Sequence, residues 1–263
     1  MAPWGWIAGG YGLLLTITGF RLRGVARRPV VIVACASFAL VAAGAATLSS
    51  FWVHLFAPGA FLLGGYWLSG LLFTAPQQAL EDRLLQSDRQ LFDRLRLDRL
   101  LERAPRWMLE ALEAVYTSDY LVVGAGAIIA ATHGAAAIVR YWTIVLAAEL
   151  ACYAALPFLR SRPPRSLEPR VTLALRGLVM RRFNATILDR ASVQANTIPS
   201  GHVAGALAAA LAVLPLNPAA GSVFLVLSLL IAVSATVGRY HYAVDCVLGA
   251  FVAVVVVAVS WAA

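Results

Sequence analysis

Long apolar runs, separated by arginine-rich segments, constrain this chain more than any other feature of its sequence. The runs are roughly 17 to 24 residues long, enough for a helix to cross a hydrocarbon core of about 30 Å. A soluble domain would break such stretches with turns, and about 45–50% of its residues would be apolar. Here 61% are apolar. We therefore expect an all-α fold, a polytopic transmembrane helical bundle.

About eight runs are expected to span the membrane. They cover residues 4–20, 30–48, 51–73, 116–132, 140–159, 201–216, 220–238 and 241–262. Three runs come before a polar stretch and five come after it. The chain is therefore expected to comprise an N-terminal three-span segment (1–75), a middle segment (76–110) and a transmembrane core (111–263).

The middle segment, residues 76–110, mixes acids and arginines densely. Leu80, Leu84, Leu91 and Leu95 recur at spacings of four and seven, which is typical of an amphipathic helix. We expect this helix to lie along the cytoplasmic membrane surface, or alternatively to pack against another subunit. Its acidic residues are expected to form a solvated face.

The arginines are distributed unevenly between the loops. All 21 basic residues are arginine, and the net charge is +8. Four follow the first run, seven lie between Arg83 and Arg106, and eight lie between Arg160 and Arg190, whereas the alternate connections hold only Arg140. The positive-inside rule then predicts a multi-pass protein of the cell membrane with cytoplasmic arginine-rich loops and both termini outside. This pattern does not favour nucleic-acid binding.

The cysteines lie inside apolar runs and show no CxxC or Cys/His spacing, so we expect buried free thiols at Cys35, Cys152 and Cys246. The histidines of the C-terminal third do not form a metal-ligand pattern either. We expect no metal and no cofactor. The oligomeric state is left open.

Polar residues open the sixth run in the segment Pro199-Ser200-Gly201-His202. A helix N-terminus presents free N–H groups and a positive dipole end to an anion, and glycine permits close approach. His202 can then exchange a proton near neutral pH. Plain N-capping by Ser200 is the alternative interpretation.

A second segment precedes the eighth run. His241 and Asp245 are four residues apart and share a helix face, with Arg239 just upstream. A carboxylate beside an imidazole fixes its tautomer and makes its other nitrogen a better nucleophile or base. The alternative is a structural His–Asp pair inside the bundle.

A third segment, residues 160–165, follows the fifth run and contains Arg162, Arg165 and two prolines. Prolines stop the helix, and the arginine fork matches phosphate oxygens, although flanking arginines are also common beside a span. An even number of crossings separates the three segments, so all three lie on one face. Together they predict one phosphate site at the cytoplasmic boundary.

At these residues the chain resembles the type 2 phosphatidic acid phosphatase superfamily, over roughly residues 115–262. Residues 199–202 match its Pro-Ser-Gly-His motif, His241-x3-Asp245 matches its His-x3-Asp motif, and Arg162-Pro163 matches its Arg-Pro end. The resemblance implies that His241 is a nucleophile forming a phosphohistidine, oriented by Asp245, and that His202 protonates the leaving alkoxide. It also implies a set of groups that bind phosphoryl oxygens: Ser200, Gly201, Arg162, Arg165 and Arg239.

Two positions depart from the superfamily pattern, because alanine stands where the resemblance leads one to expect cations. These are Ala155 and Ala235. Arg165 and Arg239 are the candidates to replace the missing charges. The Pro-Pro-Arg and His-Tyr-x-x-Asp segments look more like the branch that includes inositol phosphorylceramide synthases.

The sequence therefore predicts a metal-independent membrane enzyme that removes a phosphate or diphosphate from a lipid. Two alternatives stay open: a phosphotransferase that moves a phospho-alcohol such as phosphoinositol between lipids, and an inactive lipid-binding or transport protein. The expected partners are the bilayer and a lipid phosphate, whose identity the sequence does not specify.

Overall fold

The computed structural model describes residues 1–168 and 177–262. Over these ranges the regular elements are helices, and one isolated antiparallel bridge joins Ser161 to Asn196. The predicted all-α fold is confirmed. The helices are α1 (Pro3–Arg21), α2 (Arg28–Ala45), α3 (Phe51–Leu71), α4 (Gln78–Leu95), α5 (Leu97–Arg103), α6 (Arg106–Thr117), α7 (Asp119–Thr132), α8 (Ala135–Ala154), α9 (Pro164–Leu167), α10 (Val179–Ala191), α11 (Gly201–Val213), α12 (Pro218–Val237) and α13 (Ala243–Ala262).

All eight predicted runs form helices, but not all of them are long and apolar enough to cross a membrane. Five helices meet that criterion: α2, α3, α8, α12 and α13. The pair α6 and α7 makes a sixth candidate, bent by 50°. Length and composition thus support five or six spans within the described residues, where the sequence predicted about eight.

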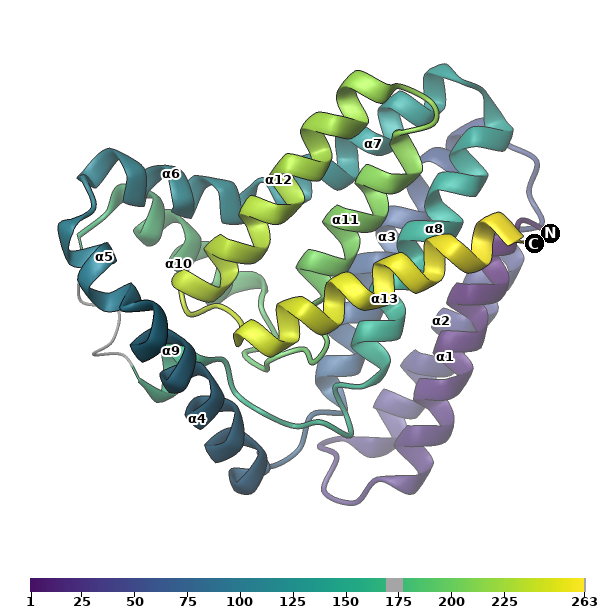
Figure 1. Cartoon of the computed structure of the whole chain (residues 1–263). Coiled ribbons are helices and arrows are strands. Elements are labelled where there is room, and N and C mark those ends of the chain that lie inside the picture. Colours follow the sequence, from purple (N-terminus) through teal and green to yellow (C-terminus); the bar gives the residue numbers. More distant parts are fainter. Residues whose placement is uncertain (169–176, 263) are drawn as a thin grey trace.

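The sixth run is the clearest departure, because α11 has only 13 residues. At 1.5 Å per residue it is about 20 Å long, short of a hydrocarbon core of about 30 Å. It is rich in buried alanine and glycine, and it contacts α7, α8, α12 and α13. Small residues let neighbouring helices approach closely. Figure 1 shows α11 in the middle of the bundle, and so protein rather than lipid surrounds most of it.

The three N-terminal helices form a group on the outer side of α8 rather than on α11. α1 and α2 pair with each other, and both α1 and α3 pack on α8 (Figure 1). The outer faces of α12 and α13 expose large apolar side chains, including Val226, Leu229, Phe251 and Val254. Contiguous apolar surface of this kind is rare on soluble monomers and suits contact with lipid chains.

The predicted amphipathic segment forms α4 and α5, which are separated at Arg96, and continues into α6. The backbone of Arg96 is left-handed, with φ 51°, and this turn ends α4. α4 buries Leu84 and Leu85 in a cluster with Ile198 and Tyr242 of its own chain. Its apolar face is therefore covered from within the molecule. Contact with the membrane surface or another subunit remains a prediction for its other faces.

The prediction that the acids of this segment form a solvated face is wrong for Glu81 and Asp88. Both side chains are buried, and both are ion-paired with arginines from later in the chain. Sequence periodicity places them on the same side of α4 as its leucines, since 81, 84, 85 and 88 follow the i, i+3, i+4, i+7 pattern. Only the tertiary structure supplies their partners.

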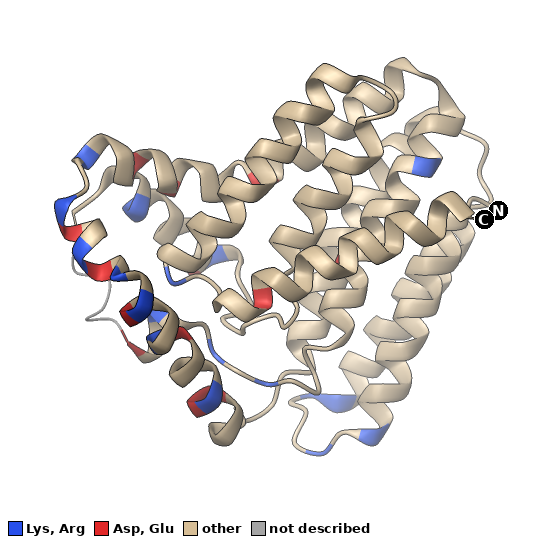
Figure 2. Ribbon diagram, viewed as in Figure 1, with Lys and Arg blue, Asp and Glu red and all other residues tan. Residues whose placement is uncertain are grey.

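Charged residues gather at one end of the bundle. Figure 2 shows them along α4, α5, α10 and the connection between α1 and α2, while most of the bundle helices are free of charge. Arg170 and Arg176, which the sequence assigns to the arginine-rich loop after the fifth run, lie outside the described residues. The end that carries these charges also holds the turn between α12 and α13, where the candidate site begins (Figure 1).

Close contact at Gly249 fixes the position of α13 along its axis relative to the start of α11. A Cβ atom at Gly249 would lie 2.4 Å from the backbone oxygen of Ser200. We predict that Gly249→Ala destabilises the protein by about 1–3 kcal/mol, the usual cost of overpacking. The measurement is the unfolding midpoint in detergent followed by circular dichroism. Gly10→Ala is the matched control because no atom lies within 4 Å of its Cβ position. Equal midpoints for the two variants would contradict the close contact.

Candidate active site

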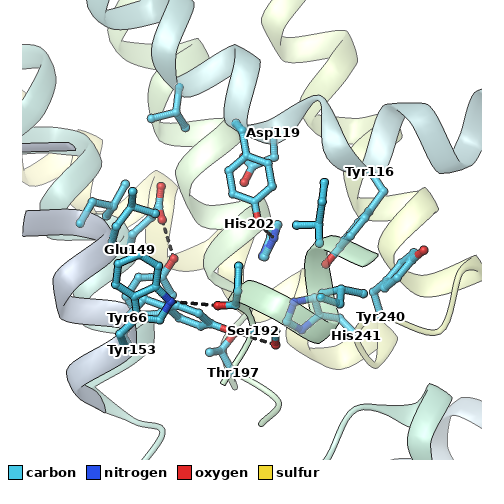
Figure 3. Close-up of a pocket in the computed structure, with 18 of the residues that line it drawn as sticks. Tyr66, Tyr116, Asp119, Glu149, Tyr153, Ser192, Thr197, His202, Tyr240 and His241 are labelled. Atoms are coloured by element: carbon cyan, nitrogen blue, oxygen red, sulfur yellow. Dashed lines mark hydrogen bonds between the residues drawn. The ribbon is translucent and has the colours of Figure 1, made fainter. Parts of the chain in front are cut away.

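A cavity of about 520 Å³ opens beside the N-terminal end of α11. It receives side chains from α3, α6, α7, α8 and α10, and from the turn between α12 and α13. Three of the predicted site residues line it: Arg165, His202 and His241. Figure 3 shows His202 and His241 near each other in this cavity.

The turn between α12 and α13 positions His241. The amides of Tyr240 and His241 both donate to the carbonyl of Ala235, at 2.9 and 3.1 Å. Arg239 takes a left-handed backbone conformation with φ 60°, which is costly for a residue with a side chain. These contacts bury the imidazole of His241, which is 5% exposed.

Asp88 of α4 fixes this turn from outside. Its Oδ2 accepts from Nη1 of Arg239 at 2.8 Å, and its Oδ1 accepts from the amide of Ala243 at 2.9 Å. Nη2 of Arg239 also donates to Glu168, at 2.9 Å. One buried carboxylate therefore holds the chain on both sides of His241.

Asp245 lies behind His241 in the first turn of α13. Its Oδ2 accepts from Nδ2 of Asn196 at 2.8 Å and from the amide of Tyr242 at 3.0 Å, which fixes the carboxylate. Nδ1 of His241 lies 3.7 Å from the same oxygen and has no hydrogen-bond partner among the described residues. Catalytic hydrogen bonds are often long in free enzymes, so a small shift brings this pair into contact.

Burial, reinforced by the positive charge of Arg165, lowers the pKa of His241 to about 3. The imidazole is then neutral at physiological pH. A neutral imidazole has a free nitrogen lone pair, which a nucleophile or base requires.

His202 faces His241 from α11, with the two ring centroids 5.7 Å apart. The ring of His202 stacks on Tyr116 at 5.2 Å, and its Nε2 lies 3.5 Å from the hydroxyl of Tyr120. The two histidines are thus neighbours in the cavity wall.

Ser200 and Gly201 are buried at the start of α11 and do not line the cavity among the described residues. The hydroxyl of Ser200 accepts from the amide of Val203 at 3.4 Å, so Ser200 caps the helix. The amide of Gly201 donates to Thr197, also at 3.4 Å. The hydroxyl of Ser200 accepts in its cap bond and can still donate, whereas the amide of Gly201 would have to leave Thr197 to contact a phosphate.

The predicted arginines occupy different environments. Arg165 lines the cavity, where its Nη1 lies 3.5 Å from the carbonyl of Tyr240. Arg162 instead forms a bidentate pair with Glu81, at 2.9 and 2.8 Å, which lowers the pKa of that carboxyl. Arg239 is buried against Asp88 and Glu168, as described above. The structure therefore brings only Arg165, of the predicted three, to the cavity.

Sequence comparison decides the family. A sequence model of the PAP2 superfamily matches residues 83–259, about two thirds of the chain. The chain belongs to the PAP2 superfamily. Comparison with curated proteins and with solved structures gave no significant match.

Membership of the PAP2 superfamily confirms the predicted type 2 phosphatidic acid phosphatase resemblance and supports a lipid phosphatase-type enzyme. The match begins at residue 83, within α4, earlier than the residue 115 predicted from the motifs. It therefore includes Asp88, the residue that holds the turn of His241. The narrower resemblance to inositol phosphorylceramide synthases remains a prediction.

Alanine occupies the two positions, 155 and 235, where the superfamily pattern leads one to expect cations, so these positions supply no charge to the PAP2 site. Ala235 is fully buried in a cluster with Tyr116 and Tyr240, whose rings stack 3.7 Å apart. Ala155 ends α8 and does not line the cavity. Among the described residues Arg165 is the one arginine in the cavity wall.

Sequence reasoning missed several polar residues of the cavity. Asp119 begins α7 inside a predicted span, and Glu149 lies within α8 and accepts from the hydroxyl of Tyr153 at 2.6 Å. Ionisable residues at membrane depth are a functional signal that could have found both. Asn196 and Thr197 carried no such signal, because isolated polar residues before a helix are common. Among the described residues no cluster of three or more His, Cys, Asp or Glu side chains is arranged to hold a metal ion.

The Asp88 contacts predict a strong effect of Asp88→Asn on this PAP2 protein. The variant leaves the buried Arg239 without half of its charge compensation, and breaking such a pair typically costs about 3–5 kcal/mol. We expect a lower unfolding midpoint and a reduced kcat of lipid phosphate hydrolysis. Asp93→Asn is the matched control because Asp93 is exposed on the same helix. A neutral Asp88→Asn variant would show that α4 does not hold the turn.

Proposed function

We propose that this protein cleaves a phosphate monoester or diphosphate of a lipid through a phosphohistidine at His241. In the first step the Nε2 lone pair of His241 attacks phosphorus and the P–O bond to the lipid breaks. A proton that the phosphate group of the substrate brings into the site passes through His202 to the departing oxygen. In the second step water attacks phosphorus, one of its protons passes to His202, the P–N bond breaks, and phosphate leaves.

One observation carries the proposal: His202 and His241 lie side by side in a cavity that also contains Arg165, with the fixed carboxylate of Asp245 next to His241. In-line transfer needs a nucleophile and a proton donor on opposite sides of phosphorus. Arg165 supplies a charged donor for the phosphoryl oxygens. Asp245 stabilises the imidazolium that forms as His241 becomes bonded to phosphorus.

The cavity suits a lipid because most of its wall is apolar. Leucine, isoleucine and tryptophan side chains from α3 and α10 provide a path for acyl or prenyl chains, among them Leu62, Leu63, Trp67, Ile187 and Leu188. The proposal places the site at the cytoplasmic face of the cell membrane, since the arginine-rich loops lie at the same end of the bundle (Figure 2).

Head-group transfer is the second candidate, in which an alcohol replaces water in the second step. The hydroxyl-rich part of the cavity wall favours it: Tyr66, Tyr120, Tyr153, Ser192 and Thr197. An inactive lipid-binding or transport protein would bind a lipid phosphate without phosphohistidine or product. Trapping the phosphoenzyme distinguishes a binding or transport protein from the two candidate enzymes.

The proposed roles predict that His241 and His202 variants respond differently to the leaving group. With a lipid monoester, His241→Ala reduces phosphate release to background, and His202→Gln reduces it about 10²- to 10⁴-fold, the usual contribution of a general acid. With p-nitrophenyl phosphate, whose leaving group needs no proton, His202→Gln regains most of the rate of the first step, measured as a burst of p-nitrophenol, and His241→Ala does not.

Both variants are compared at equal amounts of folded protein, measured by size-exclusion chromatography in detergent. An acid-labile phosphoenzyme should form with His202→Gln and be absent with His241→Ala. Wild-type phosphate release by His241→Ala would exclude the mechanism.

A second prediction separates the arginines. Arg165→Gln removes the arginine that lines the cavity and should lower kcat/KM by about 10²- to 10³-fold, as expected for a lost transition-state donor. Arg162→Gln, the matched comparison, should mainly reduce stability, because Arg162 is paired with Glu81. Steady-state kinetics and unfolding midpoints measure the two effects. The reverse ranking in kcat/KM would assign phosphate binding to Arg162.

A further inference from the structure

Two buried carboxylates in the cavity have no part in the phosphohistidine mechanism. Asp119 is 5% exposed and Glu149 is 4% exposed, and both line the cavity. Oδ1 of Asp119 is buried and has no hydrogen-bond partner among the described residues. Neither carboxylate forms an ion pair within the described part of the chain. A buried, unpaired carboxylate oxygen is costly, so it indicates a missing hydrogen-bond donor.

The carboxylates lie next to His202 rather than His241. A Cβ atom at Gly205, three residues after His202 on α11, would lie 2.0 Å from Oε1 of Glu149. Glycine at this position therefore makes room for the carboxylate one helical turn from His202. Asp119 precedes Tyr120, whose hydroxyl approaches Nε2 of His202. In Figure 3, Asp119 lies beyond His202 as seen from His241, and Glu149 lies to one side, next to Tyr153.

This position matters because of the in-line geometry proposed above. With His241 as the nucleophile, the groups around His202 contact the leaving alcohol in the first step and the accepting alcohol in the second. The wall around them is rich in hydroxyls, from Tyr66, Tyr153, Ser192 and Thr197. Carboxylates accept hydrogen bonds from hydroxyls, and protein hydroxyls can both donate and accept. Several hydroxyls of one ligand can therefore be bound at once.

We infer that Asp119 and Glu149 form a subsite for a polyhydroxy alcohol, which accepts the phosphoryl group from His241 in preference to water. The inference rests on the proposed phosphohistidine. One hydroxyl oxygen of the alcohol attacks phosphorus, an O–P bond forms, the P–N bond to His241 breaks, and the hydroxyl proton passes to His202. The remaining hydroxyls donate to Asp119 and Glu149.

The test measures how the phosphoenzyme divides between water and added alcohols. Purified full-length protein receives a labelled lipid phosphate together with glycerol or 1-propanol at equal concentration, and the ratio of phospho-alcohol to free phosphate is recorded. The two alcohols share a carbon skeleton and differ by two hydroxyls. We expect a ratio at least about tenfold higher with glycerol, the size of about one lost hydrogen bond.

The variants Asp119→Asn and Glu149→Gln should each bring the glycerol ratio down toward that of 1-propanol. Because the readout is a ratio of products, a lower overall turnover does not affect it. Glu113→Gln is the matched control, since Glu113 is also buried but pairs with Arg181 and does not line the cavity. It should leave the ratio unchanged.

Further arms identify the form of the alcohol. Monoacylglycerol compared with a fatty alcohol of equal chain length tests whether the polyol is carried by a lipid. Equal ratios for glycerol and 1-propanol, or unchanged ratios in both variants, would overturn the inference. A higher ratio with ethanolamine than with glycerol would overturn it in favour of an ammonium group. Absence of any phosphoenzyme or product in the wild type would instead reject the phosphohistidine proposal.

Discussion

The contact of Asp88 with the turn between α12 and α13 is the constraint on which the candidate site depends. Its carboxylate binds the guanidinium of Arg239 and the amide of Ala243, and His241 lies between these two residues. Both charges are buried, and each would be strongly destabilising without the other. The left-handed backbone of Arg239 is maintained by the same contacts. The conformation of the turn that carries His241 is therefore set by a helix more than 140 residues away in sequence.

The acids of α4 also decide which arginines remain available for an anion. Glu81 pairs with Arg162, and Asp88, together with Glu168, pairs with Arg239. Each of these arginines stands near a PAP2 motif, yet its charge is compensated within the protein. Arg165 lacks a carboxylate partner among the described residues and lines the cavity. Within the described residues, acids from α4 and residue 168 thus pair with Arg162 and Arg239 and leave Arg165 as the arginine in the cavity wall.

Patterns local in sequence predicted the fold class and several residues that lie close together in the structure. Apolar length identified a helical membrane protein, and the spacing of His202, His241 and Asp245 located residues that the structure brings together. Whether an arginine is ion-paired depends on side chains from helices that are distant in sequence. The periodicity of apolar residues gives no information about those contacts. Leucine spacing detected α4 but did not distinguish its buried acids from solvated ones. Of the eight predicted spans, α1 and α11 do not meet the criterion of length and composition, and α11 is apolar because other helices of the protein surround it.

The scarcity of cations in the cavity is consistent with the proposed chemistry. As Nε2 of His241 bonds to phosphorus, its imidazole acquires a positive charge, which lies directly beside the phosphoryl oxygens. Burial keeps the ring neutral before attack, so this second cation exists only while phosphorus is bonded to it. Asp245 then lies 3.7 Å from Nδ1, held by Asn196 and the amide of Tyr242, and can stabilise that charge. An interaction that arises only during the reaction lowers the barrier without tightening the binding of the ground state. The alanines at positions 155 and 235 are therefore compatible with turnover, provided that Arg165 holds the phosphoryl group in line with His241.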